Sequence, residues 1–335
     1  MPAFNPISVS GYHIREAGAT AAQELAFTLA DGFGYVEVGK SRGLDVDAFV
    51  PRLTFFFDAH IDFFEEVAKF RAARRIWARW MRDEYGASSE KAQWLKFHTQ
   101  TAGVSLTAQQ PENNIVRTAI EAFAAVLGGT NSLHTNALDE VLALPSDRAA
   151  EIALRTQNVL MMETGVTAVV DPLGGSWYVE ALTDRIEAEA EAIFESIRAM
   201  SGDGSMTDGI LSGIESGWFT QRIADAAYVY QTELERQTKH VVGVNIHTES
   251  SEEPLEVLRI SASVEDVQVE SLRGRRAQRD PDRAAASLTA MATAARSSAN
   301  IVPPMLDAVR AEVTVGKICD VLRSLFGEYV EQPTF

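Results

Sequence analysis

Four short apolar segments, each followed by polar residues and then by a helix-length amphipathic segment, constrain the fold of this chain most. They occupy residues 7–13, 52–57, 94–100 and 131–136. Strands that alternate with helices in this way are typical of parallel α/β sheets, in which functional residues gather at the carboxyl ends of the strands. We therefore predict an α/β fold with four βα units whose strand ends face one site.

Apolar residues at three- and four-residue spacing predict the helices that cover these strands. These helices are expected over residues 17–38, 62–84, 113–127 and 146–163, with Ser146 as an N-cap and a helix start almost directly after Asn136. The arginines of the 62–84 helix are interpreted as a solvated outer stripe.

Beyond residue 165 the composition changes. Helices are predicted there over residues 177–199, 221–237, 281–296 and 305–326, with one strand candidate at 240–244. The predicted organisation is therefore four βα units in residues 1–165 and a mainly helical extension in residues 166–335.

Composition and charge exclude several classes of protein. The chain has 335 residues, of which 46% are hydrophobic and 23% are charged, as in ordinary soluble globular proteins. Its formal net charge of -17, with acidic and basic residues interleaved, argues against a nucleic-acid-binding face. No apolar run reaches the roughly 18 residues of a membrane-spanning helix, and the start of the sequence resembles neither a signal nor a transit peptide. We expect a cytoplasmic protein without nucleic-acid or membrane partners.

Three histidines fall at or just after the ends of the predicted strands: His13, His98 and His134. One hypothesis is a hydrolytic zinc site with three histidine ligands and one open position. No two of them have the spacing His-x-His or His-x-x-x-His, and Glu140 is the only evident carboxylate beside them, so no metal site is predicted. The alternative for each histidine is a hydrogen-bonded group at a strand terminus, although three in equivalent positions favour a functional set.

Nucleophilic catalysis has little support in the sequence. A Gly-x-Ser-x-Gly elbow and a glycine-rich phosphate loop before a helix are both absent from it. The single cysteine, Cys319, excludes an internal disulfide and is expected in the core of a C-terminal amphipathic helix. A pocket rich in His, Tyr, Gln and Thr that lacks a nucleophile favours chemistry carried by a cofactor.

Long motifs throughout the chain resemble one enzyme family. They include Ser10-Gly-Tyr-His-Ile-Arg-Glu-Ala-Gly-Ala19, Pro51-Arg-Leu-Thr-Phe-Phe-Phe57, His98-Thr-Gln-Thr-Ala-Gly103, Gly128-Gly-Thr-Asn-Ser-Leu-His-Thr-Asn136 and Asp171-Pro-Leu-Gly-Gly-Ser176. These motifs are similar to the large subunit of methylmalonyl-CoA mutase and its relatives, which include isobutyryl-CoA and hydroxyisobutyryl-CoA mutases. The resemblance covers essentially the whole chain.

The resemblance implies the C-terminal half of a TIM (β/α)8 barrel, followed by the helical extension. In the family, an acyl-CoA substrate threads along the barrel axis, and adenosylcobalamin caps the carboxyl ends of the strands. Homolysis of the cobalt–carbon bond gives an adenosyl radical, which abstracts a substrate hydrogen and permits a carbon-skeleton rearrangement between methylmalonyl-CoA and succinyl-CoA. We therefore expect an isomerase with a radical mechanism.

The resemblance also implies roles for individual residues. His13 looks like the family histidine that hydrogen-bonds the thioester carbonyl of the substrate, with Tyr12 beside it. The residues similar to the segment that holds CoA are Arg52, Leu53 and Thr54. The residues similar to those that meet the adenosyl group and the corrin are Gln100, Gly103, Glu140 and Ala143.

The cobalt ion is not expected to be ligated by this chain. Asp58-Ala-His60 begins like the Asp-x-His-x-x-Gly signature of some cobalamin proteins, but position 63 is Phe instead of Gly. We therefore expect His60 at the rim of the barrel.

The sequence departs from the family pattern in three ways. Ala3 occupies a position where the family usually has a lysine that contacts CoA. The first four barrel strands and the cobalamin-binding domain have no counterpart in the sequence. The resemblance therefore implies a separate cobalamin-binding small subunit, and either a chain that supplies the missing half-barrel or a homo-oligomer. Without partners, unpaired edge strands are expected to make the chain aggregation-prone.

Three alternatives stay open at this point. The first alternative is an isobutyryl-CoA-type mutase subunit. The second is a non-catalytic or truncated assembly subunit. The third is a zinc-dependent hydrolase with a TIM barrel.

Overall fold

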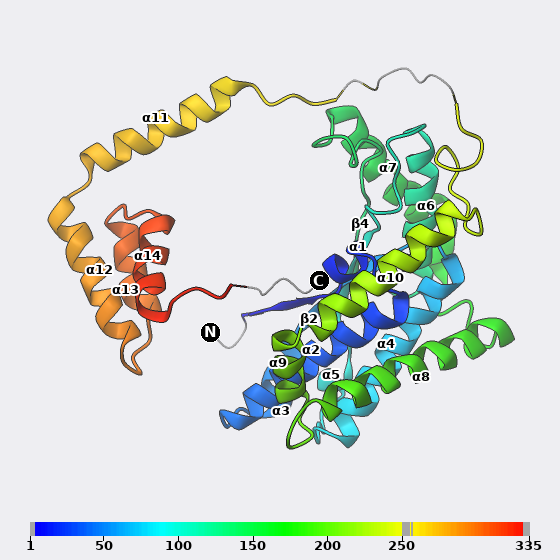
Figure 1. Cartoon of the computed structure of the whole chain (residues 1–335), viewed down its shortest axis with the longest axis horizontal. Coiled ribbons are helices and arrows are strands. Elements are labelled where there is room, and N and C mark those ends of the chain that lie inside the picture. Colours follow the sequence, from blue (N-terminus) through cyan, green and yellow to red (C-terminus); the bar gives the residue numbers. More distant parts are fainter. Residues whose placement is uncertain (1–3, 250–254, 256, 331–335) are drawn as a thin grey trace. The chain divides into compact units, whose positions relative to one another are not determined.

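Four strands form one parallel sheet, in the order in which they occur along the chain (Figure 1). The strands are β1 (Ser8–Ser10), β2 (Thr54–Ala59), β3 (Phe97–Thr101) and β4 (Ser132–His134). One level of the register holds Ser10, Phe56, His98 and Ser132 side by side. Because helices separate each strand from the next and the strand order is sequential, the sheet is compatible with part of a βα barrel.

The computed structural model describes residues 4–249, 255 and 257–330. Contacts divide the chain into a first unit that ends at Leu258 and a second unit that begins at Arg259. The predicted boundary near residue 165 separates the βα units from the helical extension. The division at residue 258 does not test that boundary, which stays a prediction. Ala3 lies outside the described residues.

One face of the sheet is apolar and covered by helices. Phe55, Phe57 and Phe97 point to this face, and their exposed fractions are 1%, 0% and 2%. They pack in the main core with residues of α2 (Ala21–Ser41), α4 (Phe63–Asp83) and α6 (Asn113–Leu127). Since side chains alternate along a strand, the residues between these phenylalanines face the opposite side of the sheet.

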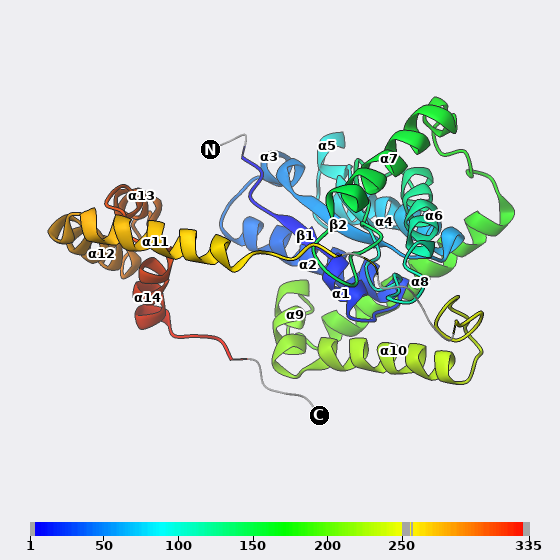
Figure 2. The ribbon, with the colours of Figure 1, turned by 90° about the horizontal axis from the view of Figure 1, so that it is seen from above.

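The other helices of the first unit connect and cover these elements. They are α1 (Tyr12–Glu16), α3 (Val46–Phe49), α5 (Glu90–Gln93), α7 (Asp147–Glu163), α8 (Trp177–Ala199), α9 (Met206–Glu215) and α10 (Trp218–Glu235), with short 3-10 helices η1 (Val50–Arg52) and η2 (Val166–Ala168). Helix α8 packs along α2 and α4, and α9 contacts α2, α8 and α10 (Figure 2).

The expectation that a helix begins almost directly after Asn136 is wrong, whereas the helix predicted over 146–163 is confirmed as α7. Turns occupy residues 138–142, and α7 begins only at Asp147. The reason is Pro145, because a proline disfavours helical geometry in the residue before it. The predicted N-cap is confirmed, since the Ser146 side chain accepts a hydrogen bond from the Ala149 amide at 3.3 Å.

The arginines of α4 are not a solvated stripe, so that interpretation is wrong. Three of them pair with acidic residues of α8, as Arg71 does with Glu180 and Arg75 with Asp184, each at 2.6 Å. Arg74 donates to the Gly128 carbonyl instead, and Arg82 is exposed. The carboxylates of α8 recur at helical spacing on the face that packs along α4. The two helices are therefore joined by a ladder of ion pairs.

The second unit contains α11 (Ala262–Gln278), α12 (Pro281–Ala295), α13 (Val302–Arg310) and α14 (Val315–Phe326). Helices α12, α13 and α14 share a small core in which Met291 and Ala308 are fully buried. The single helix predicted over 305–326 is wrong. The backbone of Glu312 has a φ of 58°, a left-handed conformation that ends a helix at this point.

Two smaller predictions in the C-terminal half are also wrong. Cys319 is exposed, and the neighbouring Ile318 occupies the core position instead. The strand candidate at 240–244 forms only an isolated bridge between Val242 and Ile246.

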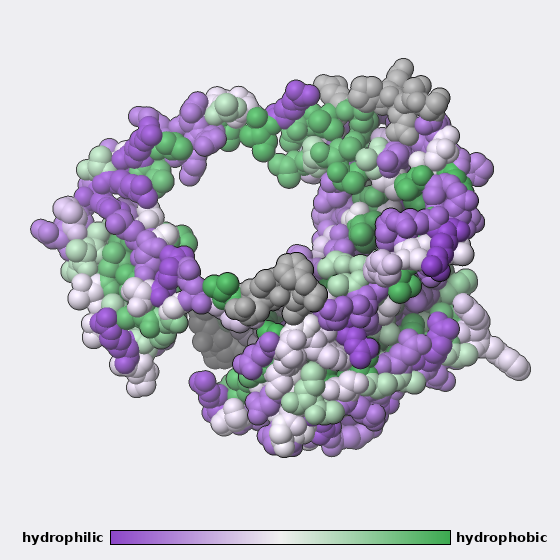
Figure 3. Space-filling model, viewed as in Figure 1, coloured by the Kyte–Doolittle hydropathy of each residue, from purple (hydrophilic) through white to green (hydrophobic). Residues whose placement is uncertain are grey.

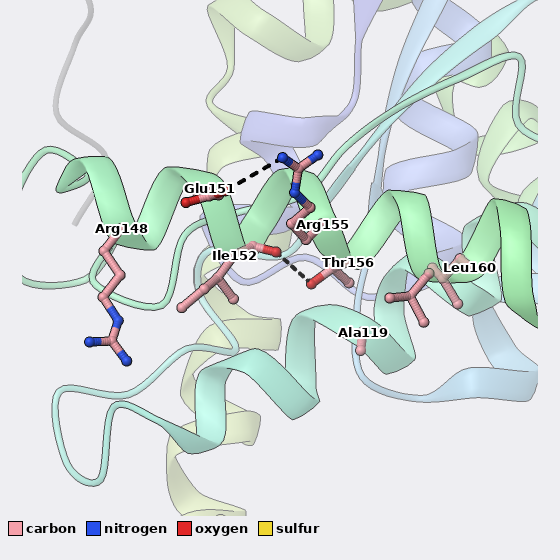
Figure 4. A pocket seen from close by; sticks show the side chains of 8 residues that line it. Ala119, Arg148, Glu151, Ile152, Arg155, Thr156 and Leu160 are labelled. Carbon is pink, nitrogen blue, oxygen red and sulfur yellow. Dashed lines mark hydrogen bonds and ion pairs between the residues drawn. The ribbon is translucent and has the colours of Figure 1, made fainter.

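The outer surface of α7 is rich in apolar side chains (Figure 3). Leu154 and Met162 are 54% and 73% exposed. Between α6 and α7 lies a cavity of about 480 Å³, lined by Ala119, Ile152 and Leu160 among others (Figure 4). None of the helices in the described parts of the chain combines the length and the apolar character needed to cross a membrane.

Candidate functional site

The face of the sheet opposite the helices carries polar and aromatic side chains. Its first level holds Ser10, Phe56, His98 and Ser132, and the level nearer the carboxyl ends holds Asp58, Gln100 and His134. Ser132 and His134 are exposed on this face. The strand alternation that builds the apolar core therefore leaves a second, open face on which functional groups converge.

An amide bridge joins the carboxyl ends of three strands. The Gln100 Nε2 group donates to Tyr12 Oη and to Asn136 Oδ1, both at 2.9 Å. Tyr12 follows β1, Gln100 lies in β3 and Asn136 follows β4. The bridge brings together two residues that the resemblance assigns to the site, and adds Asn136, to which it assigns no role. Its place just after a strand end is the signal that could have identified Asn136.

The Tyr12 hydroxyl lies in an aromatic and acidic environment. Its ring stacks on Phe56, with centroids 5.0 Å apart and ring planes 10° from parallel. Burial, followed by the negative charges of Glu16 and Asp58, raises the pKa of Tyr12. The phenol therefore stays protonated at neutral pH and is a neutral hydrogen-bond donor.

The three predicted histidines are not joined into one ligand set. His13 Nδ1 lies 3.3 Å from Ser10 Oγ, and His98 Nδ1 lies 2.7 Å from Ser132 Oγ. Burial and the charge of neighbouring His134 lower the pKa of His98. Within the described residues, no group of three or more His, Cys, Asp or Glu side chains is placed to hold a metal ion. The geometry favours hydrogen-bonding roles for His13 and His98.

Gly103 lies where three side chains approach closely. A Cβ atom at this position would lie 2.9 Å from Glu16 Oε2, 3.3 Å from Asn136 Nδ2 and 3.4 Å from Tyr12 Oη. The Nδ2 group of Asn136 is buried and forms no hydrogen bond of ordinary geometry with the described residues, although an interaction of the Asn136 side chain with the Tyr12 hydroxyl lowers the pKa of Tyr12. A buried donor that lacks such a hydrogen bond, beside a space that only glycine leaves free, is the arrangement expected where a ligand supplies the acceptor.

Two further residues that the resemblance assigns to the cofactor, Glu140 and Ala143, lie beyond β4. Glu140 is exposed, and its charge is among those that raise the pKa of Tyr12, so it lies on the same side of the site. The Ala143 amide donates to the Asp139 carbonyl at 3.0 Å. The structure thus brings Glu140 toward the site, whereas a ligand contact of Ala143 stays a prediction.

The residues that the resemblance assigns to CoA lie at the other end of the sheet. Arg52, Leu53 and Thr54 precede or open β2, a strand of 6 residues, which spans roughly 17 Å. Arg52 is exposed, whereas Leu53 is 5% exposed and belongs to the main core. The Thr54 hydroxyl donates to the Ile7 carbonyl at 3.2 Å. Arg52 and Thr54 can therefore offer side chains to a ligand, and Leu53 can offer its backbone.

Lys96 is a basic neighbour of Arg52 that the sequence patterns did not reveal. Its ammonium donates to the Pro51 carbonyl, and its own carbonyl accepts the Phe55 amide at 2.9 Å. Burial and the positive charge of Arg52 lower the pKa of Lys96. Lys96 directly precedes β3 as Arg52 precedes β2, so the pairing of the two strands places two positive charges together. This position is the signal that could have identified it.

A buried charge cluster supports β2 beneath Tyr12. The Lys69 Nζ atom lies 2.5 Å from Glu24 Oε2 and 2.8 Å from the Asp58 carbonyl, and it also pairs with Glu66. All four side chains are fully buried. Burial raises the pKa of Glu24 to about 7 and that of Asp58 well above its ordinary value. The sequence patterns did not reveal this cluster, because its members come from separate elements.

Comparison with known proteins gives one consistent result. A family model described as methylmalonyl-CoA mutase matches residues 1–328. The methylmalonyl-CoA mutase of Rhizobium meliloti is 47% identical over 99% of this chain and 46% of its own length. The probable mitochondrial methylmalonyl-CoA mutase of Caenorhabditis elegans is 43% identical over 98% of this chain and 43% of its own length.

A relative that is named for a different activity has a similar identity to this chain. The 2-hydroxyisobutanoyl-CoA mutase large subunit of Aquincola tertiaricarbonis is 44% identical over 99% of this chain and 58% of its own length. The chain therefore spans about half the length of the curated relatives that it matches.

Proposed function

Because the chain belongs to the methylmalonyl-CoA mutase family, we propose that it forms the C-terminal half of a TIM barrel in an acyl-CoA mutase, an isomerase. The observation that carries the proposal is the chemistry of the two ends of one sheet face. Positive charge lies at the amino end, with Arg52 and Lys96. Neutral amide and hydroxyl donors lie at the carboxyl end, where Gln100 bridges Tyr12 and Asn136 at 2.9 Å.

The amino end would hold the CoA part of the substrate. Arg52 and Lys96 supply positive charge for phosphate groups, and Thr54 supplies a hydroxyl. The length of β2, roughly 17 Å, separates these residues from the carboxyl end. A long ligand that lies along the strand, with its anionic part at the amino end and its reacting part at the carboxyl end, matches this arrangement. We therefore propose acyl-CoA as the substrate class.

His13 would polarise the thioester carbonyl. When the Ser10 hydroxyl donates to His13 Nδ1, which lies 3.3 Å away, the proton of the neutral imidazole is on Nε2. The exposed Nε2–H group can then donate to a carbonyl oxygen and stabilise negative charge on it without full proton transfer. Tyr12 would be a second neutral donor, held in place by its stacking on Phe56.

Adenosylcobalamin is the cofactor that the carboxyl end would accommodate. When bound, it supplies the radical that abstracts a hydrogen atom from the substrate. Gln100, Asn136 and Glu140 would hold the adenosyl group, because they offer a buried amide donor without a hydrogen bond of ordinary geometry and a carboxylate acceptor for hydroxyl groups. Gly103 and Ala143 would let the flat corrin approach, since neither carries a side chain beyond Cβ. We do not expect this chain to ligate the cobalt ion.

We propose that further strands complete the sheet of the enzyme. The sheet has edges at β1 and β4, and a parallel sheet with open edges is completed by further strands. We propose a chain that supplies the other half-barrel, or a homo-oligomer, together with a separate cobalamin-binding small subunit. A cytoplasmic location stays a prediction.

Substrate choice has a second candidate, a mutase of the isobutyryl-CoA type. It is supported by the sequences Thr107-Ala-Gln-Gln-Pro-Glu-Asn-Asn114 and Phe57-Asp-Ala-His60. The 44% identity to a 2-hydroxyisobutanoyl-CoA mutase large subunit is compatible with it. A non-catalytic or truncated assembly subunit is the alternative from outside the enzyme class.

A stepwise reconstitution tests the proposal. Mutase activity would be measured with methylmalonyl-CoA and with isobutyryl-CoA while adenosylcobalamin, a small subunit and a chain with the other half-barrel are added one at a time. Turnover that requires all three additions is expected, and the preferred ester then identifies the substrate. No turnover from a folded, verified complex would contradict the proposed activity and favour the assembly subunit.

A further inference from the structure

A second cavity, of about 450 Å³, lies near the carboxyl ends of β1 and β2. Its walls include Arg15, Glu16, His60, Asp62, Tyr230 and Lys239. Helix α10 closes one side, because a Cβ atom at Gly18 would lie only 2.5 Å from the Ala227 Cβ, so that glycine lets α10 lie against the loop after α1 (Figure 2). The cavity shares Glu16 with the candidate site, but its other residues have no part in the proposed reaction.

His60 presents a hydrogen-bond donor to this cavity. The side chain is 8% exposed, and its Nδ1 atom accepts the Ile61 amide at 2.8 Å. Burial, followed by the positive charges of Arg15 and Lys239, lowers the pKa of His60 to about 3. The ring is therefore neutral near pH 7, and its proton is on Nε2. No hydrogen bond from Nε2 to another described residue is formed, so this donor is open to a ligand in the cavity.

Cations as well as carboxylates lie around His60. Beyond burial, the groups that shift its pKa are the cations Arg15, Lys239 and Lys69. The Lys239 Nζ atom lies 4.6 Å from the centroid of the Tyr230 ring, and it forms no ion pair with the described carboxylates. Lys239 therefore has charge available for an anion.

The carboxylates in the cavity wall are engaged elsewhere. Glu65 lies 3.6 Å from the Arg15 guanidinium, and Asp62 accepts the Glu65 amide at 3.3 Å as the N-cap of α4. Glu16 accepts the Val104 amide at 3.0 Å. These groups therefore leave the positive charge of Lys239 and the His60 donor as the open contacts of the cavity.

We propose that this cavity binds an oxyanion, a carboxylate or phosphate group, through the Lys239 ammonium and the His60 Nε2–H group. An ammonium and a neutral N–H donor are the groups that commonly bind such anions, and the burial of His60 strengthens its contact. The volume exceeds that of one phosphate, so the group can belong to a larger molecule. The proposal is independent of the mutase activity, because it requires only the folded chain.

Nuclear magnetic resonance of the 335-residue chain with ¹⁵N-labelled histidine tests the proposal. Inorganic phosphate and acetate would be titrated separately while the ring signals of His60 are followed. A saturable shift with a Kd of about 1 mM or tighter is expected for at least one of them. The absence of a saturable shift with both anions would overturn the proposal.

Variants of Lys239 separate a specific contact from diffuse charge. Lys239→Gln should weaken binding about tenfold, whereas Lys239→Arg should retain it. The matched control is Lys40→Gln, because the Lys40 Nζ atom also lies over a tyrosine ring, 5.4 Å from the Tyr85 centroid, and donates to the Tyr85 carbonyl at 3.2 Å. Equal weakening by Lys239→Gln and Lys40→Gln would overturn the proposal.

A competition arm identifies the source of the oxyanion. Coenzyme A would be added to the chain saturated with inorganic phosphate. If it displaces phosphate from His60, the bound group is a phosphate of a larger ligand. If His60 stays in the phosphate-bound state, the cavity selects a free ion, and both results support an oxyanion site.

Discussion

The amino and carboxyl ends of the polar sheet face differ in the kind of group that they offer. The amino end carries the cations Arg52 and Lys96, whose proximity lowers the pKa of the lysine. The carboxyl end carries the amide bridge of Gln100 and the protonated hydroxyl of Tyr12. Cations suit a tightly held anionic tail, whereas neutral donors suit a reacting centre whose charge changes little. One sheet face can therefore separate binding from chemistry along its strands.

The largest effect is expected from the carboxyl end. In a reconstituted complex, His13→Ala should lower kcat by about 10²–10³-fold, because it removes the donor to the thioester oxygen. Steady-state turnover measures this change. The exposed His240→Ala is the control and should leave kcat unchanged. Near-full turnover of His13→Ala would remove His13 from the reaction and break the proposed division of roles.

The close approach of side chains to Gly103 allows a test of the proposed cofactor site at the carboxyl end. Gly103→Ala should weaken adenosylcobalamin binding by about tenfold or more, because its Cβ atom would lie 2.9 Å from Glu16 Oε2 and force a shift. Equilibrium binding of the cofactor to the complex gives the affinity. Gly316→Ala is a control in open space. Unchanged affinity in both variants would show that Gly103 does not line the cofactor site.

The amino end should respond differently. Arg52→Ala and Lys96→Ala should each raise KM for acyl-CoA about tenfold at nearly constant kcat, because each removes a charged contact made equally in the ground and transition states. Initial-rate kinetics separate the two constants. The exposed Lys91→Ala is the control. A loss confined to kcat would place Arg52 in the chemistry and contradict its assignment to CoA.

The buried cluster beneath the carboxyl end predicts a pH dependence of stability. The pKa of Glu24 is raised from 4.5 to about 7, so the folded state retains a proton that the unfolded state releases. The contribution of Glu24 to the free energy of unfolding should therefore be largest below pH 4.5. This contribution should be lost as the pH rises toward 7. Asp58 acts in the same direction.

Urea unfolding at a series of pH values between these limits measures this contribution. Glu24→Gln should flatten the dependence, since glutamine does not titrate. A slope that is the same in Glu24→Gln and in the unchanged chain would assign the titration to other groups.

The smallest effect is expected far from both ends, in the ion pairs of α4 and α8. Arg71→Ala should lower the free energy of unfolding by about 1 kcal/mol, because its partly buried guanidinium pairs with Asp171 and Glu180. Thermal unfolding measures the change. Arg82→Ala is the matched control, since Arg82 pairs only with its chain neighbour Asp83. A loss of turnover in Arg71→Ala without a loss of stability would show that α4 affects the reaction directly.

Local features of the fold could be predicted from the sequence. The four strands and the Ser146 cap depend on residues close together in the chain, so their patterns are visible in it. The start of α7 was predicted for the same reason, from Ser146. The break at Glu312 was not, since the apolar spacing continues across a residue whose conformation depends on packing.

Contacts between distant segments could not be predicted in the same way. The partners of Arg71 lie on a segment about a hundred residues later, and nothing local distinguishes them from solvated acids. Lys96 and Asn136 join the site only through strand pairing and the amide bridge. The resemblance assigned Tyr12 and Gln100 to different ligands, and only the structure shows that their side chains contact each other.

Hydrogen–deuterium exchange of the reconstituted complex tests the division of the sheet face most directly. Coenzyme A alone should protect the amides of residues 52–54 and 96–97 near the amino end. Adenosylcobalamin with the small subunit should protect residues 100–104 and 134–140 at the carboxyl end. If both ligands protected the same segment, or if coenzyme A protected only the carboxyl end, the proposed separation of binding and chemistry would be wrong.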